Sequence, residues 1–213
     1  MKNLKFIYLA VVLFSVMGFV SCSEKDDTEE EFPNWQVKNE TFFKNLKDSV
    51  NKLVANGDTA EWTIYKIWSQ PQAPYKAGDS SDSIIIVHKL INGTGSGCPL
   101  YTDSVRAHYQ GRLLPSTSYA SGYVFGQSYS TSLDNYDVKS SIPSKLAVSG
   151  VVDGFSTALQ RMHIGDRWIV YMPQQLGYGT SGSGSTIPGY SVLRFDIMLM
   201  AYYRAGQIVP AWK

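Results

Sequence analysis

The sequence predicts an α+β fold in which a short helix packs on an antiparallel β-sheet. Large apolar residues recur at every second position over 167–172 and again over 193–199, which is typical of strands with one well-buried face. Phe155, Leu159 and Met162 instead fall at helical spacing. Because this short helical segment is followed by long alternating strands, we expect the helix to lie against the sheet.

The N-terminus has the pattern of a secretory signal peptide over residues 1–21. Two lysines precede an apolar run over 6–20, which with its flanks is too short to favour a membrane-spanning helix. The sequence Phe-Val-Ser-Cys that ends at Cys22 resembles a lipoprotein cleavage box. This resemblance implies that Cys22 becomes the first mature residue and carries a lipid anchor. The alternative is plain secretion, with Cys22 as an ordinary thiol.

An acidic segment follows Cys22. Residues 24–31 hold six acidic residues and one lysine, so we expect 22–33 to be a solvated, disordered tether. The segment also resembles acidic tags that send some Gram-negative lipoproteins to the outer face of the outer membrane; a plain linker is the alternative. We therefore expect an outer-membrane lipoprotein of the cell envelope, on its periplasmic or its surface face.

Charge and cysteine usage exclude several classes of function. Without residues 1–21, Lys plus Arg falls from 19 to 17 against 18 acidic residues, so nothing predicts nucleic-acid binding. If Cys22 is lipidated, only Cys98 remains, and no intramolecular disulfide is expected. His88, His108 and His163 share no metal-ligand spacing, so no metal site is expected.

Between the tether and the strands described above, the pattern predicts an N-terminal extension over 34–83. Apolar residues at helical spacing predict a helix over 35–56 that uses Phe42, Leu46, Val50 and Leu53. An alternating strand over 61–68 and a loop rich in Pro, Gly, Asp and Ser follow. A second strand from Ile84 begins the main domain, which we expect to span 84–205.

Short signals in the main domain occur in a characteristic order. They are Val151 and Val152, Gly154 and Phe155, Gly165 and Asp166, Tyr178 and Gly179, Ile187 and Pro188, and Phe195 and Asp196. This ordered set resembles the C-terminal half of FKBP-type peptidyl-prolyl cis/trans isomerases. Upstream, the Asp103-x-Val105 and His108-Tyr109-x-Gly111 signals also resemble the family, and Phe125 resembles the first residue of its Phe-Asp-Ser-Ser motif.

The resemblance implies a curved antiparallel β-sheet wrapped around one short helix, with an N-terminal helical extension. It implies a peptidyl-prolyl isomerase that acts without metal, nucleophile or cofactor on proline-containing unfolded or surface proteins. The implied site is an aromatic pocket formed by Tyr109, Phe125, Val151, Val152, Phe155, Tyr178, Ile187 and Phe195. The Val152 N–H and the Tyr178 hydroxyl would donate hydrogen bonds to the bound peptide. No oligomeric state follows from the sequence.

Two departures from the family keep other functions open. Gly126 stands where Phe-Asp-Ser-Ser has its carboxylate, and Phe155 replaces the usual tryptophan of the pocket floor. These changes favour a catalytically weak or inactive peptide-binding module on the same fold. A third interpretation is a cell-surface scaffold that binds through the helix at 35–56. The family's helical extensions dimerise or hold clients, but we expect this single helix to pack on the sheet.

Overall fold

The computed structural model describes residues 29–57, 59–70, 74–129 and 141–212. The predicted signal peptide and lipidated Cys22 lie outside these ranges. The chain from Glu31 to Lys213 forms one compact unit. All of the fold described below belongs to this unit.

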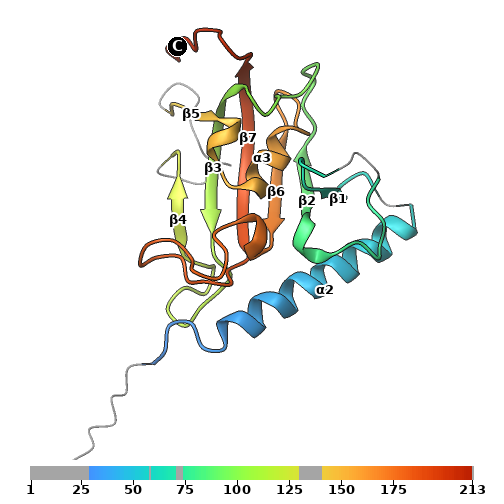
Figure 1. The fold of residues 1–213 in the computed structure, drawn as a ribbon, viewed down its shortest axis with the longest axis vertical. Coiled ribbons are helices and arrows are strands. Elements are labelled where there is room, and N and C mark those ends of the chain that lie inside the picture. Colours follow the sequence, from blue (N-terminus) through green and yellow to red (C-terminus); the bar gives the residue numbers. More distant parts are fainter. Residues whose placement is uncertain (1–28, 58, 71–73, 130–140, 213) are drawn as a thin grey trace, which may run out of the picture. The chain divides into compact units, whose positions relative to one another are not determined.

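An antiparallel sheet occupies the centre of the unit (Figure 1). Its strands are β1 (Trp62–Lys66), β2 (Ile84–Ile91), β3 (Ser104–Arg112), β4 (Val124–Gln127), β5 (Ser144–Ala147), β6 (Arg167–Met172) and β7 (Leu193–Tyr203). They lie in the order β1-β2-β6-β7-β3-β4, and β5 pairs with β3. Every pairing is antiparallel. The predicted α+β fold with an antiparallel sheet is therefore confirmed.

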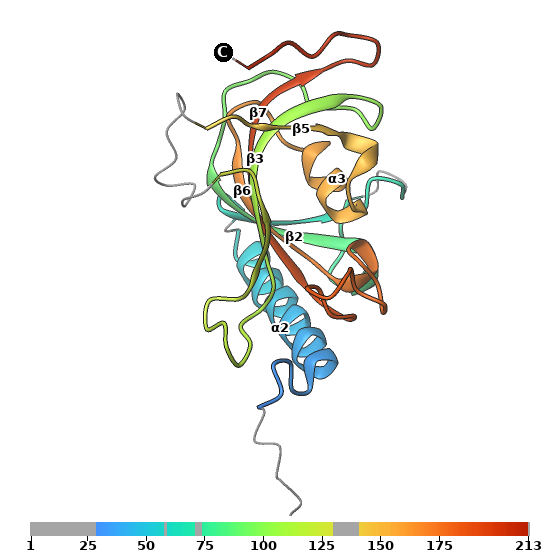
Figure 2. The same ribbon diagram turned by 90° about the vertical axis from the view of Figure 1, so that its left-hand side faces the viewer.

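Two α-helices cover opposite faces of the sheet (Figure 2). They are α2 (Trp35–Ala55) and α3 (Asp153–Leu159). A Cβ on Gly154 of α3 would lie 2.6 Å from the Met172 sulfur, whereas the Tyr171 ring lies 5.9 Å from that of Phe42 in α2. Because successive strand residues point to opposite faces, α3 lies on one face, called here the inner face, and α2 on the other, the outer face.

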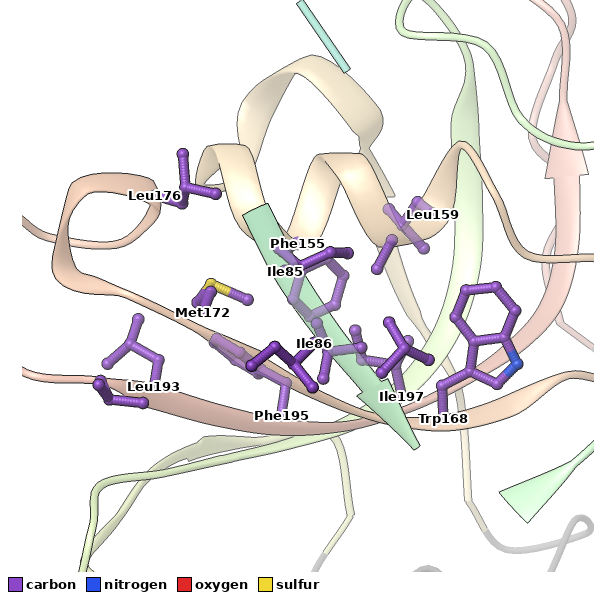
Figure 3. Close-up of a cluster of buried hydrophobic side chains, with 14 of the residues drawn as sticks. Ile85, Ile86, Phe155, Leu159, Trp168, Met172, Leu176, Leu193, Phe195 and Ile197 are labelled. Atoms are coloured by element: carbon purple, nitrogen blue, oxygen red, sulfur yellow. The ribbon is translucent and has the colours of Figure 1, made fainter. Parts of the chain in front are cut away.

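The core on the inner face is built between α3 and strands β2, β6 and β7. Phe155 and Leu159 point from the helix toward the sheet, where Phe195 and Ile197 lie (Figure 3). Met162 is buried as its spacing suggests, but it lies beyond the end of α3. The chain instead turns back through Gly165, whose φ of 94° is costly for other residues.

The N-terminal segment joins the same unit at several points. The predicted strand at 61–68 is β1, which pairs along β2 and so extends the main sheet. The predicted helix is also present, but its buried residues are Trp35, Asn39, Phe43 and Val50, while Phe42 and Leu46 are only partly buried. The tether prediction extends too far, because the Glu31 carboxylate accepts hydrogen bonds from the Ser116 hydroxyl and the Ser118 N–H.

Short 3₁₀ turns complete the element order at three connections. They are η1 (Ser81–Ser83), η3 (Val148–Gly150) and η4 (Gln174–Leu176). The first precedes β2, the second leads into the segment before α3, and the third begins the long connection from β6 to β7. The last two flank the candidate site.

Candidate active site

A cavity of about 330 Å³ opens on the inner face of the sheet. It is lined by Tyr109, Phe125, Gly126, Leu146, Gly150, Val151, Val152, Phe155, Tyr178 and Phe195. Strands β3, β4 and β7 supply one side, the start of α3 and the segment before it supply a second, and the β6–β7 connection supplies Tyr178. Segments far apart in the sequence are thus brought to one predominantly apolar cavity.

The aromatic side of this cavity is held by perpendicular ring contacts around Phe195. Its ring centroid lies 5.0 Å from that of Phe155 and 5.3 Å from that of Phe125, at interplanar angles of 88° and 87°. The Tyr109 ring meets Phe155 at 5.9 Å and 89°. Edge-to-face contacts of this kind are favoured by the charge distribution of aromatic rings. The rings therefore hold one another in place and form a rigid apolar surface.

A glycine makes this ring cluster possible. Gly111 lies in β3 opposite Phe195 of β7 and Gly126 of β4. A Cβ at Gly111 would lie 2.5 Å from the Phe125 Cζ and 2.7 Å from the Phe195 Cε1, closer than side chains approach one another. The two rings thus rest directly on the β3 backbone. This explains the glycine of the His-Tyr-x-Gly signal in physical terms.

The polar groups of the cavity come from loop and helix-end positions. Val152 immediately precedes the first residue of α3, so its backbone is at the cavity edge. Tyr178 is 37% exposed, and burial raises the pKa of its hydroxyl, with a smaller contribution from nearby Tyr109. A tyrosine hydroxyl whose pKa lies above its usual value of 10.0 is protonated at neutral pH, so it is a hydrogen-bond donor next to the aromatic rings.

The expected carboxylate is absent from the described lining residues, and Gly126 takes its place. Its backbone φ is not positive, so this strand position does not require glycine. A Cβ at Gly126 would have only one neighbouring atom within 4 Å, the Tyr109 Cε2 at 3.8 Å, which is an ordinary contact. The site therefore has room for an acidic side chain that the sequence does not supply.

Seven of the eight residues that the sequence predicts for the site lie together in this lining, and Ile187 does not. Ile187 is buried, and its N–H and C=O exchange hydrogen bonds with Ser183 within the β6–β7 connection. Its contribution is to the shape of the loop that carries Tyr178. Leu146 and Gly150 line the cavity but were missed. Leu146 lies in the short, half-exposed β5, which has little hydrophobic periodicity, and Gly150 ends the 3₁₀ turn η3 and has no side chain to give a signal.

Other kinds of site are not evident in the described part of the chain. No group of three or more histidine, cysteine, aspartate or glutamate side chains is arranged to hold a metal ion among the residues that the structure describes. Within the same residues, no helix has the length and apolar character needed to cross a bilayer. The cavity is thus the feature on which a functional assignment rests.

Comparison with known proteins finds similarity to peptidyl-prolyl cis-trans isomerases. A family model for FKBP-type peptidyl-prolyl cis-trans isomerases matches residues 98–200. The FKBP-type 22 kDa peptidyl-prolyl cis-trans isomerase of Escherichia coli is 32% identical over 125 residues, which are 59% of this chain and 53% of that protein. The match therefore spans about half the length of that relative.

A second relative matches over nearly the whole chain. The macrophage infectivity potentiator of Trypanosoma cruzi is 31% identical over 202 residues, covering 94% of this chain and 87% of that protein. Among solved structures, FkpA from Escherichia coli is similar with a TM-score of 0.53 and 21% identity, over 80% of this chain and 62% of that one. The structural similarity supports the fold, with its curved sheet, short helix and N-terminal helix.

Proposed function

This chain belongs to the FKBP-type peptidyl-prolyl cis-trans isomerase family, and we propose that it isomerises X–Pro bonds in extracytoplasmic proteins. The observation that carries the proposal is the rigid aromatic cavity around Phe195, with the Tyr178 hydroxyl at its edge. This arrangement suits a proline ring and a peptide carbonyl. We propose that the substrates are unfolded or surface-exposed polypeptides that contain proline.

The chemistry requires only that the cavity bind a twisted amide better than a planar one. Rotation about an X–Pro bond has a barrier of about 18–20 kcal/mol, because the planar amide is stabilised by resonance. Water favours the planar, more polar amide, so an apolar surface formed by Phe155 and Phe195 removes part of that preference. The Tyr178 hydroxyl and the Val152 N–H are donors that need not reorganise during the rotation.

A second function has support from one observation, the absence of a carboxylate among the described lining residues. A site that holds proline peptides but lacks the group at Gly126 would be a weak isomerase or a peptide-binding module. The aromatic cluster is the same in both cases. The two functions therefore differ in turnover and agree in binding.

The test is a protease-free isomerisation assay on the compact unit Glu31–Lys213 with a proline peptide. We expect Phe125→Ala to reduce turnover, because this ring lines the cavity, while the control Tyr119→Ala removes an exposed ring outside the lining. Circular dichroism checks that both variants fold. Peptide binding without turnover in the wild type would support the binding module. If neither binding nor turnover occurs, both functions are excluded.

We further propose that the mature protein is anchored in the cell envelope as an outer-membrane lipoprotein through Cys22. The support is the sequence pattern of residues 1–22. Cys22→Ser should release the protein from the membrane fraction or block its processing. An unchanged membrane fraction with the mature mass of the wild type would contradict a lipid anchor.

A further inference from the structure

The first turns of α2 bind the connection that carries Tyr178. The Trp35 indole N–H donates to the Ser191 hydroxyl at 2.8 Å, and this hydroxyl donates to the Pro188 carbonyl at 2.7 Å. One helical turn later, the Asn39 side-chain carbonyl accepts the Val192 N–H at 2.8 Å. Trp35, Asn39 and Ser191 are all buried. The helix thus holds two successive residues just before β7 begins.

The connection between Tyr178 and Tyr190 is a closed hairpin. The Tyr190 N–H donates to the Gly179 carbonyl at 3.0 Å, and Ser183 pairs with Ile187 nearer the tip. The two arms pack so closely that a Cβ at Gly189 would lie 2.7 Å from the Thr180 carbonyl carbon. Because the arms are tied together, the hairpin is expected to move as one body about its base. Tyr178 is adjacent to that base.

The base itself has an unusual backbone conformation. Tyr190 has a φ of 63°, a value that residues other than glycine seldom adopt. Its own N–H is bonded to Gly179, and the next two residues are bonded to α2. A conformation of this kind persists only where the surroundings hold it on both sides. The contacts from Trp35 and Asn39 supply one of those sides.

We propose that Trp35 and Asn39 are positioning residues, which fix the Tyr178 hydroxyl over the cavity through Ser191, Val192 and the Tyr190–Gly179 bond. The inference rests on the proposed isomerase function and assigns α2 a part in it. The helix then does more than cover the outer face of the sheet. Its first turns determine how well the loop side of the cavity is organised.

The test compares Trp35→Phe and Asn39→Ala with a control on the same helix. Trp35→Phe keeps an aromatic ring and removes one donor, and we expect kcat/KM to fall by about 2- to 10-fold, as for one lost hydrogen bond. The control Asn51→Ala removes a 3.0 Å hydrogen bond from the Tyr75 hydroxyl, away from the hairpin. It should lower stability and leave kcat/KM unchanged.

A double-variant cycle separates positioning from general stability. In a Tyr178→Phe background the hydroxyl is already absent, so Trp35→Phe should reduce kcat/KM by less than it does in the wild type. Amide hydrogen exchange gives a readout that does not depend on turnover. The Gly182, Ile187 and Tyr190 amides should exchange faster in Trp35→Phe and Asn39→Ala than in Asn51→Ala, relative to β6 and β7.

The two readouts distinguish failure of the inference from failure of the proposed function. If the wild type shows no isomerisation but the hairpin amides exchange faster in the two variants, positioning stands and the isomerase function fails. If both variants lose thermal stability while hairpin exchange stays as in the wild type, the inference is overturned, and α2 only stabilises the fold.

Discussion

The two faces of the sheet differ in how they are held together. On the inner face, Phe195 lies among three other aromatic rings and lines the cavity. On the outer face, its neighbour Asp196 forms a two-point ion pair with Arg167, with oxygen–nitrogen distances of 3.1 and 2.8 Å. Adjacent residues of β7 thus line the cavity on one face and form an ion pair on the other.

Beside the apolar side chains buried under α2, such as Phe43 and Val50, the outer face has other directional contacts. His88 stacks on Trp62 with ring centroids 4.3 Å apart and planes 2° from parallel, and Asn39 bonds to the chain just before β7. The inner face carries a rigid apolar surface at the cavity, whereas directional contacts on the outer face help to hold the sheet and α2. We therefore expect changes on the inner face to alter binding and turnover, and changes to the outer ion pair to alter stability alone.

The largest effect should follow from Phe195→Ala. The ring is 5% exposed and contacts Tyr109, Phe125 and Phe155, so its removal should cost about 3–5 kcal/mol of folding stability. Turnover should also be lost, because the rings no longer hold one another. Chemical denaturation measures the first effect and the isomerisation assay the second. Retained turnover in a folded Phe195→Ala protein would show that the aromatic cluster stabilises the hydrophobic core and takes no part in turnover.

Asp196→Ala tests the outer face at the next residue. Loss of the carboxylate leaves the Arg167 guanidinium, whose side chain is 11% exposed, without this partner, and we expect a loss of about 3 kcal/mol. Peptide isomerisation by the folded fraction should be unchanged. If kcat/KM of Asp196→Ala falls at temperatures well below the melting temperature of this variant, the distinction between the two faces is lost.

Gly126→Asp supplies the missing carboxylate on the inner face. The position has no positive φ and has space for a Cβ, so the fold should be kept. We expect kcat/KM to rise by about tenfold, which corresponds to about 1.4 kcal/mol, near the lower end for a hydrogen bond to a charged group. Such effects grow where water is excluded. Unchanged turnover with normal stability would show that the acid is not what limits this site.

Tyr178→Phe keeps the ring and removes one hydroxyl. If this hydroxyl donates to the bound peptide, kcat/KM should fall by the equivalent of about 0.5–1.5 kcal/mol. Stability should change little, because the side chain is 37% exposed. Binding of a proline peptide, measured by titration, should weaken in parallel. Wild-type affinity in this variant would remove Tyr178 from the site.

The smallest effect concerns pH. Burial raises the pKa of Tyr178 above its usual value of 10.0, so the neutral donor persists until the pH approaches that raised value. Its contribution to binding and stability is complete below pH 10 and is lost as pH rises through the folded-state pKa. The kcat/KM profile should therefore be flat from pH 7 to about pH 10 as far as this group is concerned. A decline centred below pH 10 that disappears in Tyr178→Phe would contradict this.

The fold and most of the site were predictable because their signals are local. Strand alternation in β6 and β7 and the order of short motifs pointed to Phe155, Tyr178 and Phe195, which the structure brings together in one cavity. That Ile187 is not among the lining residues was not predictable, because its place depends on a hairpin closed by backbone hydrogen bonds with Ser183. The polar anchoring by Asn39 was missed as well. A buried asparagine on an apolar helix face has no sequence signal until its partner, 153 residues away, is known.

The hydrogen bond between Trp35 and Ser191 also bears on the order of folding. It joins residues 156 positions apart, and the helix that supplies Trp35 is synthesised long before β7. Contacts of such high sequence separation form late, because the intervening chain must first be ordered. Until then the Trp35 indole N–H lacks its Ser191 partner, so the first turn of α2 stays undocked from this loop in the nascent chain. The loop side of the cavity is thus among the last parts to be completed, and the protein gains its finished cavity only when its own folding is nearly over.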